Sequence, residues 1–158
     1  MYREKIEELK KWKQSPDRKP LIIRGARQVG KTWLMKEFGE KYYDKCAYIN
    51  FDDNSRMTKL FEEDFDLDRI IQGLKIESGV NIEAENTLII LDEIQETPKA
   101  LKALKYFCEN AREYHIISAG SLLGVAIHEG TSFPVGKVDF LDLKPLSFFE
   151  FIEAMRRK

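Results

Sequence analysis

One stretch of the sequence has the residue types and the spacing that hold a polyphosphate. It reads Gly25-Ala26-Arg27-Gln28-Val29-Gly30-Lys31-Thr32, the pattern GxxxxGKT. A polyphosphate needs backbone N–H groups directed at it, and a glycine-rich loop lets the main chain come that close. In this pattern Lys31 provides a cation for the β- and γ-phosphates, and the Thr32 hydroxyl provides a ligand for Mg²⁺. The stretch therefore predicts a site for a nucleotide and its Mg²⁺.

The segments on either side of this loop are those that the pattern requires. The apolar run Leu21-Ile22-Ile23 before it is typical of a strand, and residues 32–38 after it have helical spacing. A helix that begins near Gly30 adds its free N–H groups and the positive end of its dipole. This context favours a ligand site over a glycine-rich turn without a ligand. We predict that the nucleotide is bound by Gly25, Ala26, Arg27, Gln28, Val29, Gly30, Lys31, Thr32 and Trp33.

Two acidic residues further along the chain supply the second half of such a site. Residues 87–91 form an almost continuous apolar run, as expected of a central parallel strand, and Asp92-Glu93 follow it directly. Carboxylates at the carboxyl end of such a strand lie at the ligand-binding edge of an open α/β sheet. We predict that Asp92 helps Thr32 to hold Mg²⁺ and that Glu93 polarises a water for attack on the γ-phosphate. Lys31 and Glu93 are thus candidate catalytic residues.

Composition narrows the class of protein. The 158 residues suffice for one domain, and a net charge of −1 gives no general attraction to nucleic acid or to anionic membranes. Cys46 and Cys108 imply no disulfide framework, and His115 and His128 are too isolated to suggest a metal site. No stretch approaches 18 apolar residues, and the first residues lack a signal-peptide core. We expect a soluble, cytoplasmic protein with no membrane partner and no direct indication of nucleic-acid binding.

The remaining pattern alternates helices with strands. We expect a first helix that stops at Ser15-Pro16, a second that ends near Gly39, an irregular acidic stretch over residues 52–68, and a helix from Ile70 to Gly79. Thr97-Pro98 opens a further helix, and Ser147 with Glu150 forms a capping box that opens the last one. The additional predicted strands are 46–51, 114–119 and 137–143. The chain ends inside its last predicted helix, so we expect a domain truncated at its C-terminus.

This alternation predicts an α/β fold, a three-layer sandwich around a mainly parallel five-stranded sheet. In P-loop proteins, an extra strand lies between the phosphate-loop strand and the acidic strand when a glutamate directly follows the aspartate. By this fold-level analogy we expect a P-loop NTPase sandwich with strand order 5-1-4-3-2, with residues 118–121 at the carboxyl end of the inserted strand.

Several runs together resemble one known family. They are residues 18–32 around the phosphate loop, Leu91-Asp92-Glu93-Ile94-Gln95, Ala119-Gly120-Ser121, and residues 143–151, which read Leu-Lys-Pro-Leu-Ser-Phe-Phe-Glu-Phe. In this order they resemble a group of prokaryotic AAA-type ATPases. The resemblance implies that residues 1–158 form an AAA-type ATPase domain that uses ATP and Mg²⁺. It also implies a C-terminal partner domain, absent from this chain, for which the ATPase acts as a motor or switch.

Two further roles follow only from this resemblance. Ser121 matches the polar residue that senses the γ-phosphate and is a third candidate catalytic residue, although it also suits a helix N-cap. The family usually has Gly-Arg where this chain has Gly136-Lys137. A lysine keeps the charge but loses the bidentate fork of arginine, which puts an arginine-finger role at this position in doubt.

Three functions remain in competition. The leading one is Mg²⁺-dependent ATP hydrolysis, which we expect to be slow in the isolated chain. We also expect concentration-dependent association of the chain into homo-oligomers. The second is a nucleotide-dependent binding module with negligible hydrolysis. The third is a small-molecule P-loop kinase, disfavoured by the adjacent Asp92-Glu93 pair and by the lack of an arginine-rich lid. A GTPase is disfavoured because no Asn-Lys-x-Asp motif occurs.

Overall fold

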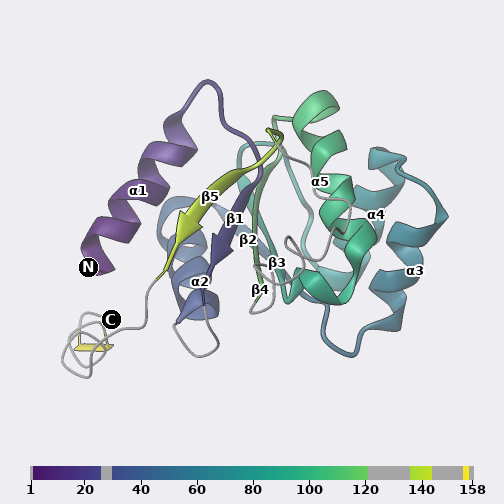
Figure 1. Cartoon of the computed structure of the whole chain (residues 1–158), viewed down its shortest axis with the longest axis horizontal. Coiled ribbons are helices and arrows are strands. Elements are labelled where there is room, and N and C mark those ends of the chain that lie inside the picture. Colours follow the sequence, from purple (N-terminus) through teal and green to yellow (C-terminus); the bar gives the residue numbers. More distant parts are fainter. Residues whose placement is uncertain (1, 26–29, 121–135, 144–154, 157–158) are drawn as a thin grey trace.

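A parallel sheet forms the middle layer of the protein, with helices on both faces (Figure 1). The computed structural model describes residues 2–25, 30–120, 136–143 and 155–156. Within them the strands are β1 (Leu21–Arg24), β2 (Lys45–Asn50), β3 (Thr87–Asp92), β4 (His115–Gly120) and β5 (Asp139–Asp142). Their order in the sheet is β2-β3-β4-β1-β5, and every pair is parallel. The predicted α/β fold and the predicted order 5-1-4-3-2 are confirmed, with β4 inserted between β1 and β3.

Alternate residues of each strand feed two separate apolar cores. Leu21 and Ile23 of β1 pack with α1 (Tyr2–Gln14) and α2 (Lys31–Tyr42). Ile22, between them, packs with the other core, which includes residues of α3 (Ser55–Glu63), α4 (Leu67–Ser78) and α5 (Pro98–Asn110). Every residue of β3 and β4 is buried. The sheet is therefore covered on both faces, as its near-continuous apolar strands predict.

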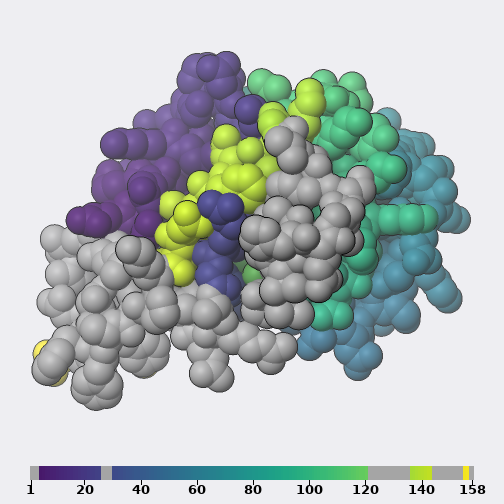
Figure 2. Space-filling view, in the orientation of Figure 1, coloured from purple at the N-terminus to yellow at the C-terminus, as the bar shows by residue number. Residues whose placement is uncertain are grey.

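β5 lies at one edge of the sheet. The space-filling view shows it on the surface beside β1, between the purple α1 and the green and teal helices of the other layer (Figure 2). Phe140 of β5 is 39% exposed, and the Arg24 guanidinium lies 4.2 Å from the centre of its ring. In the part of the chain that the structure describes, no helix is long and apolar enough to cross a membrane.

The acidic stretch predicted to be irregular contains a helix, α3, and the beginning of α4. The side chain of Asn54 caps α3 by accepting a hydrogen bond from the Met57 backbone N–H. Met57 and Phe61, four residues apart, are buried, and the rings of Phe61 and Phe51 are 5.7 Å apart. Only these few apolar residues, among many charged ones, mark the helical period of this segment. The sequence pattern therefore did not reveal the helix.

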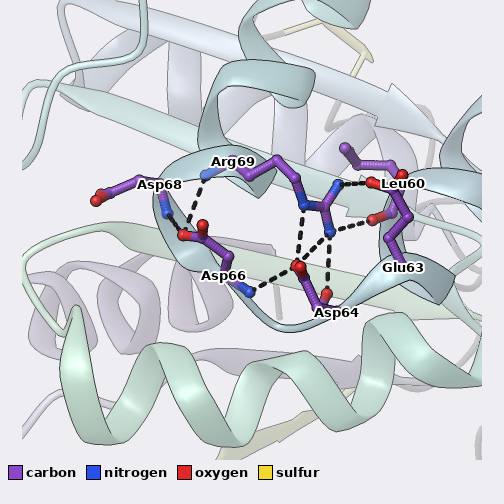
Figure 3. Close-up of polar contacts among 6 residues, drawn as sticks. All are labelled: Leu60, Glu63, Asp64, Asp66, Asp68 and Arg69. Carbon is purple, nitrogen blue, oxygen red and sulfur yellow. Dashed lines mark hydrogen bonds and ion pairs between the residues drawn. The ribbon is translucent and has the colours of Figure 1, made fainter.

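Arg69 fixes the turn between α3 and α4 (Figure 3). Its guanidinium donates to the carbonyl oxygens of Leu60 and Asp64 and to the Asp64 carboxylate, at 2.8 to 3.0 Å, and forms an ion pair with Glu63. The Asp66 carboxylate caps α4 by accepting hydrogen bonds from the backbone N–H groups of Asp68 and Arg69. One side chain thus satisfies two carbonyl groups at the carboxyl end of α3 and sets the entry of the chain into α4.

Gly39 does not end α2, as the sequence suggested; the helix continues to Tyr42. The glycine is required for packing instead. A Cβ atom at Gly39 would lie 2.8 Å from Cys46 Sγ and 3.2 Å from Leu88 Cδ2. Its small size therefore lets α2 pack closely against β2.

The other predicted boundaries of helices and strands differ little from the observed ones. The ends of β2, β4 and β5 differ from the predicted ones by a residue or two. Thr97 and Pro98 occupy the predicted first positions of α5, but the Thr97 hydroxyl pairs with that of Thr58 at 3.2 Å and does not cap the helix. The capping box predicted for Ser147 and Glu150 lies outside the described residues, whereas Met155 and Arg156, further along the same predicted helix, are helical.

His115, at the amino end of β4, is a buried histidine whose pKa is lowered to about 4. Burial is the main cause, and the charges of Arg18 and Lys13 act in the same direction. Its Nδ1 lies 2.6 Å from the Tyr43 hydroxyl, and the Trp12 ring packs against it edge to face. The fold therefore favours the neutral imidazole.

We predict that this histidine makes stability fall as the pH falls from about 6.5 to about 4. In this window the unfolded chain binds a proton that the folded chain does not, so acid favours unfolding, by up to about 3 kcal/mol. Urea unfolding at several pH values measures this. His115→Gln should flatten the slope. An unchanged slope in His115→Gln would contradict the assignment.

We also predict that Gly39→Ala destabilises the protein by about 1 kcal/mol. Alanine gains about 1 kcal/mol of helix propensity, but overpacking against the thiol costs about 1–3 kcal/mol. In a Cys46→Ala background the same substitution should be neutral or stabilising, because the closest atom is gone. Unfolding free energies of the four proteins in this cycle test the idea, which fails if the two backgrounds give the same change.

Candidate functional site

The loop between β1 and α2 opens at the carboxyl edge of the sheet. Gly25 directly follows β1, and Gly30 precedes α2 in the left-handed region, at φ 87° and ψ 19°. Its carbonyl oxygen accepts the hydrogen bond from the Leu34 N–H at 2.9 Å, the first of the helix. The N–H groups of the first helical turn have no acceptor within the helix and suit an anion. Ala26, Arg27, Gln28 and Val29 lie outside the described residues.

Lys31 is buried at the start of α2, with 7% of its surface exposed. Its Nζ donates a hydrogen bond to the Gly25 carbonyl oxygen at 2.9 Å, across the predicted loop. Burial lowers the pKa of this ammonium, while the nearby carboxylates of Glu93 and Asp92 act to raise it. A partly desolvated cation gains more from an anionic ligand than an exposed one does, because the local dielectric is lower.

The Asp92 carboxylate, at the end of β3, is the acceptor around which the site is arranged. It is 3% exposed. The Thr32 hydroxyl donates to Oδ2 at 2.6 Å, the Tyr48 hydroxyl donates to the same oxygen at 2.7 Å, and the Glu93 N–H donates to Oδ1 at 3.0 Å. The predicted metal pair, Thr32 and Asp92, is thus in direct contact.

Glu93 follows in the left-handed region, at φ 56° and ψ 42°, and leads into the short helix η1 (Ile94–Glu96). This conformation costs a non-glycine residue about 1–3 kcal/mol. Its carboxylate accepts a hydrogen bond from Gln95 Nε2 at 2.6 Å. The other end of that amide, Gln95 Oε1, is buried and has no hydrogen-bond partner among the described residues.

These groups surround one cavity of about 530 Å³. It is lined by Gly30, Lys31, Thr32, Trp33, Tyr48, Asn50, Asp52, Asp92, Glu93 and Glu96. The structure therefore brings Gly30 and the first turn of α2 together with Asp92 and Glu93 at the end of β3. Ser121 lies outside the described residues and is not placed.

Lys137, which stands where the family usually has an arginine, lies away from this cavity, and so does Arg112. Lys137 precedes β5 and forms an ion pair with Glu109 at 3.2 Å, near the end of α5. Arg112 donates to the carbonyl oxygen of Cys108 at 3.2 Å, also at that end. Both belong to the amino edge of the parallel sheet, opposite the edge that holds Asp92.

Sequence reasoning missed five residues of the site: Tyr48 and Asn50 of β2, Asp52 just after β2, and Gln95 and Glu96 of η1. A signal existed for two of them. Tyr48 and Asn50 are two residues apart on a predicted strand, so they share one face, and Asn50 ends the strand at the ligand-binding edge. What the pattern did not provide was the register, in which Asn50 lies opposite Asp92.

The chemistry of this donor set suits a nucleotide with a hard cation. A threonine hydroxyl and a buried carboxylate offer oxygen ligands, which Mg²⁺ prefers, and Mg²⁺ commonly takes its remaining ligands from phosphates and water. A lysine and the amino end of a helix lie next to them for the phosphates. The described residues therefore fit Mg²⁺ with a polyphosphate.

Comparison with known proteins agrees with this geometry. Residues 17–152 match the profile of a family described as an AAA domain. A Walker-type ATPase of Pyrococcus abyssi superimposes with a TM-score of 0.58 at 18% identity, over 96% of this chain and 56% of that one. The Orc1 protein of Aeropyrum pernix, solved in complex with DNA, gives 0.57 at 14% identity, over 99% and 47%. No curated protein matches the chain significantly.

These structural likenesses show a shared fold. The chain spans about half the length of the two solved structures. The described fold and the family match therefore identify a nucleotide-binding module of the P-loop type.

Proposed function

This chain belongs to the AAA domain family, and on that basis we propose that it binds ATP with Mg²⁺ in the cavity beside Asp92 and hydrolyses it. The observation that carries the proposal is the 2.6 Å hydrogen bond from Thr32 to Asp92, next to the buried Lys31. A phosphate loop and an acidic strand are far apart in sequence, and their direct contact is what a shared metal–phosphate site needs.

Binding would rest on the loop and on the first turn of α2. Backbone N–H groups of residues 25–30 would donate hydrogen bonds to the phosphate oxygens. Lys31 would give up its hydrogen bond to the Gly25 carbonyl and contact the β- and γ-phosphates instead. Thr32 would keep donating its hydrogen to Asp92 while its oxygen faces the cation. Thr32 and Asp92 would hold Mg²⁺, which would supply neutralisation of the negative charge on the phosphates.

Hydrolysis would depend on Glu93. A water held by its carboxylate would give a proton to Glu93 and attack the γ-phosphorus. The bond to the β–γ bridging oxygen would break, ADP would leave with that oxygen, and inorganic phosphate would be the second product. Catalysis of this kind rests mainly on positioning and electrostatics. We assign Ser121 as the residue that senses the γ-phosphate, on the family resemblance alone.

A binding module with negligible hydrolysis is the second candidate, favoured by one observation. Among the described residues that line the cavity, the cation is Lys31, and none is an arginine. Arginine fingers contribute about 10³–10⁵-fold in related reactions. Phosphate release from ATP at rising protein concentration separates the candidates, because turnover that appears only on self-association points to a group supplied by a second copy.

The wider role is also a proposal. We propose that residues 1–158 form the ATPase domain and act as a motor or switch for a C-terminal domain absent from this chain, as homo-oligomers in the cytoplasm. A reducing compartment suits the two thiols: Cys108 is buried, and burial raises the pKa of the half-buried Cys46 thiol to about 11.

We predict that Lys31→Ala abolishes stabilisation by ATP. At ligand 100-fold above its Kd, the wild type should gain about 2.7 kcal/mol. The variant should gain almost nothing, since it lacks the cation that meets the phosphates. Thermal unfolding with and without Mg²⁺ and ATP measures the difference. Lys41→Ala is the matched control, because Lys41 is an exposed lysine of the same helix; equal gains in Lys31→Ala and Lys41→Ala would refute the site.

We predict that Glu93→Gln still binds ATP but hydrolyses it about 10²–10⁴-fold more slowly, because an amide cannot accept the proton of the water. Asp92→Asn should instead weaken the Mg²⁺-dependent part of binding. Phosphate release and calorimetric titration give the two readings. Glu96→Gln makes the same change at another carboxylate of the cavity and should leave turnover nearly intact. Normal turnover in Glu93→Gln would remove Glu93 from the mechanism.

A further inference from the structure

We propose that Tyr48 is a positioning residue that holds the Asp92 carboxylate in place for Mg²⁺, so that its hydroxyl sets how strongly Mg²⁺ promotes nucleotide binding. The inference rests on the proposed function and extends it to a residue of β2, outside the phosphate loop and outside the acidic pair.

The position of Tyr48 in the sheet makes the contact. Its Cα lies opposite Ile90 in the β2–β3 register, so Asp92 is its diagonal neighbour, two residues further along β3. An aromatic side chain is long enough to reach a diagonal neighbour on the same face of a sheet. The hydroxyl accordingly meets Asp92 Oδ2 at 2.7 Å, beside the Thr32 hydroxyl, which meets the same oxygen at 2.6 Å.

The ring of Tyr48 is itself fixed. It is half-buried and packs against the apolar core beneath α2, and the Lys36 ammonium lies 4.0 Å from its centre. Lys36 follows Thr32 by one helical turn, so both lie on the same side of α2. α2 thus meets Tyr48 through Lys36 and meets Asp92 through Thr32. Tyr48 of β2 therefore contacts α2 through its ring and the end of β3 through its hydroxyl.

The consequence concerns the freedom of the carboxylate. With Oδ1 engaged by the Glu93 N–H and Oδ2 by two hydroxyls, Asp92 is held in one rotamer. Burial and the neighbouring Asp92 raise the pKa of the Tyr48 phenol, which therefore remains a neutral donor. Without this hydroxyl, Asp92 retains the Thr32 contact alone on Oδ2 and can turn away when a cation engages Thr32. Loss of such an outer partner commonly weakens metal affinity by about 10–100-fold.

The test is Tyr48→Phe, which removes one oxygen and keeps the ring under Lys36. ATP binding to the 158-residue chain is measured by calorimetry, first in EDTA and then over a titration of Mg²⁺. We expect unchanged affinity in EDTA and an approximately tenfold rise in the Mg²⁺ concentration that gives half of the full enhancement. Tyr43→Phe is the matched control: it removes a hydroxyl 2.6 Å from His115, at the other edge of the sheet, and should leave the Mg²⁺ requirement as in the wild type.

A double-mutant cycle separates this role from a merely structural one. In an Asp92→Asn background, Tyr48→Phe should have little further effect on the Mg²⁺ requirement, because the carboxylate that the hydroxyl positions is gone. Equal Mg²⁺ requirements in wild type and Tyr48→Phe overturn the role of Tyr48 while leaving the proposed function intact, and so does an undiminished effect beside Asp92→Asn. A wild type whose ATP binding does not respond to Mg²⁺ overturns the proposed function and this inference with it.

Discussion

A carboxylate buried at the end of a central strand is the constraint on which the site depends. Asp92 is 3% exposed, and a charge taken out of water is costly unless hydrogen bonds replace its hydration. The fold supplies these from three segments: α2 through Thr32, β2 through Tyr48, and its own next residue through the Glu93 N–H. Meeting this one requirement therefore brings the phosphate loop, the edge strand and the acidic strand to one point.

The two apolar cores make that convergence rigid. β3 is buried along its whole length, and its residues alternate between the core under α2 and the core under α3, α4 and α5. Since both faces are packed, the register of β2 on β3 cannot slip without moving every side chain to the wrong face. The register is what sets Asn50 opposite Asp92 and Tyr48 on the diagonal. Packing far from the cavity thus fixes distances inside it.

The sequence was informative where the determinants are local. The run from Gly25 to Thr32 and the pair Asp92-Glu93 each lie in a few consecutive residues, and they indicated the strands that precede them. The strand order came from the fold-level analogy with P-loop proteins. The sequence did not predict α3 because the helix has few apolar residues among many charged ones. The role of Gly39 was predicted wrongly because its small size is required by contacts with Cys46 and Leu88, which lie in two strands. The role of Tyr48 was missed for the same reason, because its contact with Asp92 depends on the β2–β3 register, which no local pattern contains. The assigned roles of the site residues remain predictions.

Several groups at this edge of the sheet carry a free-energy cost in the folded chain. Glu93 is held in the left-handed region, Gln95 Oε1 is buried without a partner among the described residues, and burial lowers the pKa of Lys31. Costs of this kind, of about 1–3 kcal/mol for a strained residue, persist only where the surroundings over-determine the conformation. For Lys31 this cost comes from burying a positive charge. A bound anion would relieve it, because a phosphate beside the ammonium stabilises the charged form that burial disfavours. Under the proposed function, part of the affinity for ATP would then come from a penalty already present in the free protein. The two apolar cores that hold β1 and β3 in place are what allow the folded chain to retain it.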